Sequence, residues 1–140
     1  MRSAALVTYV LVLAAGATTQ APNNGVPSVD GNWRITSMII NGQAVGSSGD
    51  VSIEFSGTDY AQVQQGRVEE RGTFVVDRSA APMAIDFAIA EGAAANMTQR
   101  GIVEISGDTL RLHLSQPGEA IRPADFRPLR DRMLITAIRQ

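Results

Sequence analysis

Residues 101–114 read Gly-Ile-Val-Glu-Ile-Ser-Gly-Asp-Thr-Leu-Arg-Leu-His-Leu, and this stretch decides the fold. Apolar side chains alternate with polar ones on both sides of Ser106-Gly107-Asp108, a period of two that is typical of half-buried β-strands. Gly107 can adopt the positive φ that a tight hairpin turn requires. The stretch therefore predicts two antiparallel strands, residues 101–105 and 109–114, joined by a short turn.

The same alternation recurs in six further segments, which are separated by turns and short loops. These segments cover residues 32–40, 51–55, 59–64, 67–76, 84–90 and 132–139. Eight short strands with mostly local connections predict an all-β fold, a single eight-stranded antiparallel barrel of the up-and-down kind. The alternation does not say which strands pair, so an open or flattened β-sandwich and a jelly roll are the alternatives.

The first residues of the chain have the pattern of a secretory signal peptide. Arg2 precedes an apolar run from Ala4 to Ala15, and the small residues Ala15-Gly16-Ala17 follow as a cleavage site. The run is shorter than the about 20 residues of a membrane-spanning helix. We expect residues 1–17 to be removed, residues 18–29 to form a flexible tail and residues 30–140 to form the barrel domain.

This pattern predicts a secreted or periplasmic protein with no membrane span in the mature chain. Cleavage after Thr19-Gln20-Ala21 and retention of the apolar run as an uncleaved anchor are the alternatives.

The composition excludes several kinds of chemistry. The net charge is −2 and the arginines are scattered, so the chain lacks the clustered basic surface of a nucleic-acid binder. It has no cysteine, which excludes disulfides, thiol nucleophiles and thiolate metal sites. It has no lysine, which excludes Schiff-base chemistry.

His113 is the one histidine, and the alternation places it with Thr109 and Arg111 on a polar strand face that we expect to meet solvent. It has no second histidine at a metal-binding spacing. No Gly-x-Ser-x-Gly sequence presents a serine nucleophile. We therefore expect no enzyme activity, no metal and no cofactor, and we expect His113 to be dispensable.

Six short blocks, in this order, give the chain a resemblance to a known family. They are Trp33 with Asn41-Gly42, Gly72-Thr73-Phe74 with Asp77, Pro82 with Ile85-Asp86, Gly101-Ile102-x-Glu104, Gly107-Asp108-Thr109-Leu110, and Arg122-Pro123-x-x-Phe126. Together they resemble an uncharacterised lipocalin-like domain family that is abundant in planctomycete-type bacteria. The resemblance implies a lipocalin-like barrel and an exported protein. The role of that family is unknown, so the resemblance implies no activity.

Trp33, at the start of the first strand, follows the Gly-x-Trp pattern of lipocalins, in which the tryptophan packs against an arginine near the end of the barrel. The resemblance implies that Arg139 or Arg132 fills this place. A core tryptophan without a special partner is the alternative. Phe126 lies in the longest connection, and we expect it to plug one mouth of the barrel, as a cap on the core or as a lid over a cavity.

Two functions are compatible with such a barrel. The first is binding of a small apolar or amphipathic molecule inside it. The side chains expected to line that cavity are Ile35, Ile53, Phe55, Phe74, Phe87 and Leu112. The second is a solid-cored module that acts by its surface, at the cell envelope or on a protein partner.

Overall fold

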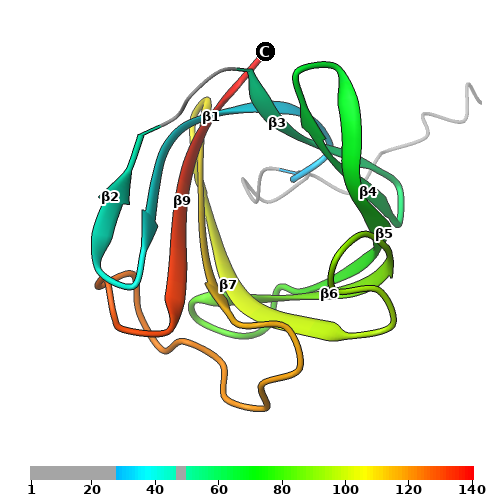
Figure 1. Cartoon of the computed structure of the whole chain (residues 1–140). Helices are drawn as coiled ribbons and strands as arrows, with labels where there is room; N and C mark the ends of the chain where they lie inside the picture. Colours follow the sequence, from blue (N-terminus) through cyan, green and yellow to red (C-terminus); the bar gives the residue numbers. More distant parts are fainter. Residues whose placement is uncertain (1–27, 47–49) are drawn as a thin grey trace, which may run out of the picture.

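The computed structural model describes residues 28–46 and 50–140 (Figure 1). The predicted signal peptide and most of the predicted tail lie outside the described residues. The described part forms nine strands: β1 (Gly31–Ile40), β2 (Gln43–Val45), β3 (Val51–Ser56), β4 (Asp59–Gln64), β5 (Arg67–Asp77), β6 (Met83–Glu91), β7 (Thr98–Ser106), β8 (Thr109–Ser115) and β9 (Arg132–Arg139). The same residues include no helix that is long and apolar enough to cross a membrane.

The strands form one closed antiparallel sheet. The order around it is β1, β3, β4, β5, β6, β7, β8 and β9, and β9 pairs back with β1 through partners that run from Trp33–Arg139 to Ile40–Met133. Figure 1 shows these strands as a ring. The closure confirms the predicted eight-stranded, lipocalin-like barrel, because an open sandwich would leave sheet edges unpaired.

β2 is an additional strand that the sequence did not predict. It folds back on the end of β1 across the turn at Asn41-Gly42, so that Met38 pairs with Val45 and Ile40 with Gln43. All of its residues are exposed, so no alternation of buried and exposed positions marks it as a strand. The other strands begin and end within 3 residues of their predicted bounds.

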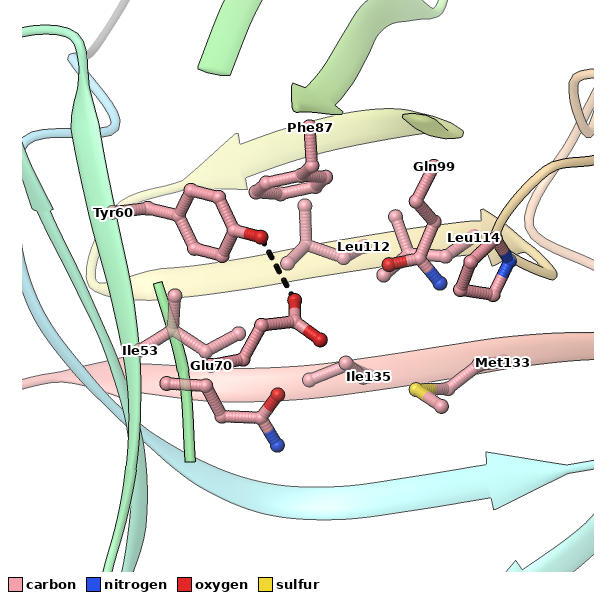
Figure 2. Close-up of a pocket in the computed structure, with 11 residues that line it drawn as sticks. Ile53, Tyr60, Glu70, Phe87, Gln99, Leu112, Leu114, Met133 and Ile135 are labelled. Atoms are coloured by element: carbon pink, nitrogen blue, oxygen red, sulfur yellow. Dashed lines mark hydrogen bonds between the residues drawn. The ribbon is translucent and has the colours of Figure 1, made fainter. Parts of the chain in front are cut away.

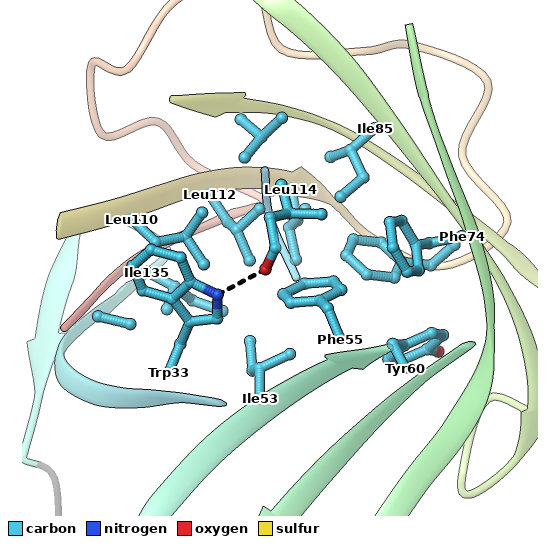
Figure 3. Close-up of a cluster of buried hydrophobic side chains, with 14 of the residues drawn as sticks. Trp33, Ile53, Phe55, Tyr60, Phe74, Ile85, Leu110, Leu112, Leu114 and Ile135 are labelled. Atoms are coloured by element: carbon cyan, nitrogen blue, oxygen red, sulfur yellow. Dashed lines mark hydrogen bonds between the residues drawn. The ribbon is translucent and has the colours of Figure 1, made fainter. Parts of the chain in front are cut away.

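A cluster of buried hydrophobic side chains fills the barrel interior at the end where β1 begins, here called the Trp33 end (Figure 3). Trp33, Ile85 and Leu110 are 0% exposed there. Phe55 and Phe74 meet edge to face with their ring centroids 4.9 Å apart. The opposite end, here called the open end, carries the turns that join β1 to β2, β4 to β5 and β6 to β7.

The connection from β8 to β9, residues 116–131, covers the outside of the barrel. It starts at the open end and runs along the outer face of β6, β7 and β8. The Ser115 hydroxyl donates a hydrogen bond to the Ile121 carbonyl, and the Arg100 guanidinium donates one to the Ala120 carbonyl at 3.3 Å.

Arg122 fastens this connection to the wall. Its Nη1 donates to the backbone carbonyls of Ile85 and Gly101, at 3.1 and 2.8 Å. The same nitrogen lies 2.8 Å from a carboxylate oxygen of Asp86. One guanidinium therefore joins the connection to both β6 and β7.

His113 is buried, so the expectation that it meets solvent was wrong. It does lie on the outer strand face, opposite Leu112 and Leu114, but the connection covers that face and leaves it 0% exposed. Its Nδ1 is hydrogen-bonded to the Asp125 carbonyl. Strand alternation separates the two faces of a sheet, but it does not say whether a loop covers one of them.

Phe126 also packs on the outer face. The Arg111 guanidinium lies over the Phe126 ring, 4.3 Å from its centroid. Arg111 is on the outside of the barrel, where its cross-strand partners are Glu104 and Thr136. Phe126 thus covers the wall of the barrel and does not plug a mouth.

Candidate functional site: a cavity at the open end of the barrel

A cavity of about 140 Å³ lies inside the barrel and reaches from its middle toward the open end (Figure 2). Most of its wall is apolar, with a few polar groups nearer the open end. The lining residues are Ile53, Tyr60, Gln62, Glu70, Phe87, Gln99, Leu112, Leu114, Pro117, Met133 and Ile135. They come from β3 to β9 and from the start of the 116–131 connection, so the cavity depends on the closed barrel.

Three of the six residues expected to line a cavity do so: Ile53, Phe87 and Leu112. Phe55 and Phe74 are buried in the packed core, toward the Trp33 end (Figure 3). Ile35 is buried in the same core and borders a separate hollow beside β2 and β3. All six residues face the inside of the barrel, as expected. The sequence did not indicate which of them lie in the packed core and which line the cavity.

Tyr60 and Glu70 form the main polar feature of the cavity. The Tyr60 hydroxyl donates a hydrogen bond to Oε1 of Glu70 at 2.8 Å, and Figure 2 shows both groups pointing into the space between the apolar walls. Burial raises the pKa of Tyr60 above its ordinary value, and the hydrogen bond and negative charge of Glu70 raise it further. The hydroxyl therefore stays protonated and acts as a donor.

The backbone beside Tyr60 makes room for its ring. Gly72 is the cross-strand partner of Tyr60, and a Cβ on Gly72 would lie 3.0 Å from the tyrosine ring and 2.0 Å from the Ala88 carbonyl oxygen. With no side chain there, the Tyr60 ring packs edge-on against Phe87, with centroids 4.7 Å apart. The absence of a side chain at Gly72 thus leaves room for the Tyr60 ring.

Gln99 provides a second polar group. It is 8% exposed, and its Nε2 donates to the Ser115 carbonyl at 2.9 Å. That bond turns the amide oxygen toward the interior, as Figure 2 shows.

Sequence reasoning missed these polar lining residues, although part of the signal was present. Glu70 and Gly72 alternate with Phe74 on β5, and Gln62 alternates with Tyr60 on β4. The strand period therefore puts all of them on the inward face. Val68, which the same period would place inside, is 45% exposed because the pairing of β4 and β5 shifts register between Gln62 and Val63.

The Trp33 end of the barrel is closed by a small cluster of contacts. The Trp33 indole donates from Nε1 to the Val29 carbonyl at 2.7 Å, the contact marked in Figure 3. The Arg139 guanidinium lies over the indole, 4.2 Å from the ring centroid. Arg139 also donates to the carbonyls of Asp30 and Ser28, at 2.7 and 3.2 Å, which holds residues 28–30 across this end.

Within residues 28–46 and 50–140, no group of three or more His, Asp or Glu side chains is placed to hold a metal ion. In comparisons with known proteins, no family model, no curated protein and no solved structure matches this chain.

Proposed function

We propose that this chain is an exported, non-enzymatic binding protein that holds one small, mainly apolar molecule inside a lipocalin-like barrel. The observation that carries the proposal is the cavity of about 140 Å³, with apolar walls and a few hydrogen-bonding groups at one side. Ligand sites in proteins combine these two features, because apolar walls supply affinity and a few polar groups fix orientation. Export is supported by the leader pattern of residues 1–17.

The size of the cavity limits the ligand. A core cavity of about 150 Å³ with apolar walls can bind benzene, whereas sites for drug-sized ligands have about 300–1,000 Å³. A cavity of about 140 Å³ therefore fits a molecule near the size of one aromatic ring. The alternative of a solid-cored interaction module would require side chains to fill this space.

The proposal is tested by titrating benzyl alcohol into the chain and following side-chain methyl signals by NMR. We expect saturable shifts for Leu112, Leu114 and Ile135, which line the cavity. Met133→Trp should abolish them, because a larger side chain at the open end fills the space. Val75→Trp is the matched control, since Val75 is 70% exposed.

Saturable shifts in the wild type and in Val75→Trp, but not in Met133→Trp, support the proposal. Shifts that do not saturate would show that benzyl alcohol has no specific site, and saturable shifts that persist in Met133→Trp would show that it binds outside the cavity.

A further inference from the structure

The polar side chains that line the cavity are those of Tyr60, Gln62, Glu70 and Gln99, and the donors of Tyr60 and Gln99 are already engaged. The single O–H of Tyr60 is engaged by Glu70, and the amide nitrogen of Gln99 is turned to the Ser115 carbonyl. A carboxylate accepts at both oxygens, and Oε2 of Glu70 makes no hydrogen bond with the described residues. A ligand that enters therefore meets a carboxylate oxygen and an amide oxygen.

Glu70 is the one charged residue among those that line the cavity. None of the ion pairs between described residues includes Glu70. These pairs join Arg111 to Glu104, Arg122 to Asp86, Arg127 to Asp125 and Arg132 to Glu119. A half-buried carboxylate without a cation is unfavourable compared with one in water. A positive charge brought by a ligand would offset this cost.

Aromatic rings stand beside the carboxylate. Tyr60 and Phe87 both line the cavity, and their rings are in edge-to-face contact. Aromatic faces attract cations, and the attraction grows when the cation is desolvated. An ammonium group next to Glu70 would therefore meet a carboxylate and two aromatic rings in the same small space.

We propose that the cavity selects a protonated primary amine carried on an apolar group of about one ring. The inference rests on the proposed function and goes further by naming the ligand class. The ammonium donates to Glu70 Oε2 and to the Gln99 amide oxygen. The apolar part packs on Leu112, Phe87 and Ile135. A ligand with a carboxylate is rejected, because its charge would lie against Glu70.

The test compares three probes of nearly equal size, benzylamine, benzyl alcohol and benzoate, by NMR titration of the full chain at pH 7. Because hydrogen bonds to charged partners are the stronger kind, benzylamine should bind about tenfold to hundredfold more tightly than benzyl alcohol. Benzoate should give no saturable shift.

Glu70→Gln keeps the shape of the side chain and removes its charge. We expect it to reduce the preference for benzylamine over benzyl alcohol to about twofold or less, while benzyl alcohol still binds. Glu69→Gln is the matched control, because it makes the same change of charge at the neighbouring exposed position. This variant should keep the wild-type preference.

Two results would overturn the inference and leave the binding function standing. One is equal binding of benzylamine and benzyl alcohol by the wild type. The other is an unchanged preference in Glu70→Gln. Failure of every probe to bind would overturn both the inference and the proposed function.

Discussion

Trp33 closes one end of the barrel through one face of its ring, its indole nitrogen and its complete burial. Arg139 covers the ring, the indole nitrogen donates to Val29, and the side chain is 0% exposed. The other arginine considered from the sequence, Arg132, is paired with Glu119 at 2.7 Å. The Gly-x-Trp pattern thus pointed to the right kind of contact, and only the fold could show which arginine makes it.

Trp33→Ala should lower the free energy of unfolding by about 3–5 kcal/mol, because it leaves a large void in a packed core and removes the cation–π contact. Trp33 is the only tryptophan, so urea unfolding is followed by circular dichroism and not by fluorescence. Arg34→Ala is the control, since Arg34 is exposed on the other face of β1. A variant as stable as the wild type would show that the ring lies at the periphery.

His113 and Glu70 show which features the strand periodicity of the sequence does not predict. His113 faces outward, as its strand position predicts, and yet it is buried beneath a loop whose path is a long-range feature. The strand period alone is enough to place Glu70 inside the barrel. Its hydrogen bond with Tyr60 depends on the register between β4 and β5, which the period does not give. Periodicity predicts which face a side chain occupies; contacts between strands and loops must come from the fold.

The 116–131 connection is held in place by contacts with strands that lie far from it in the sequence. It packs on the outer wall through Arg122, His113 and the Ser115 hydroxyl, and it brings Pro117 to the rim of the cavity. Its docking therefore shapes the open end as well as the outer wall.

Arg122→Ala should release this connection without unfolding the barrel. Hydrogen bonds from a charged donor contribute about 1.5–3 kcal/mol, so local opening should become about tenfold to hundredfold more frequent. The readout is hydrogen exchange at the Gly118 amide, which donates to the Thr98 carbonyl at 2.9 Å. Amides in the middle of β7 and β8 should keep their protection.

Arg127→Ala is the control for that experiment. The Arg127 side chain is 84% exposed, and its ion pair is with Asp125 of the same connection. Exchange at Gly118 should therefore be unchanged. Equal effects of the two substitutions would contradict the role given to Arg122.

At the level of elements, the sequence predicted the eight barrel strands, but it predicted neither β2 nor the position of the 116–131 connection. The eight barrel strands follow from apolar alternation and turn residues, since both are local properties. β2 was not predicted because its three residues are all exposed, so they show no apolar alternation. The packing of residues 116–131 on the outer wall was not predicted because it depends on contacts between positions far apart in the chain, such as Arg122 with Ile85.

At the scale of the molecule, the described residues form a barrel that is filled at one end and hollow at the other. Aromatic and branched side chains pack the Trp33 end, whereas the side chains nearer the open end leave a cavity between them. A closed barrel was predicted from the number and spacing of the strands, with an open sandwich or a jelly roll as the alternatives, and the pairing of β9 with β1 decides for the barrel. The position of the hollow was not predicted, because it depends on how individual side chains fit together.

Native mass spectrometry of the chain, purified from the cells that encode it, tests the central claim that the barrel holds a small molecule. We expect one bound molecule per chain, lost on denaturation and absent from Met133→Trp. A bare mass in repeated preparations of the folded wild type would contradict the claim.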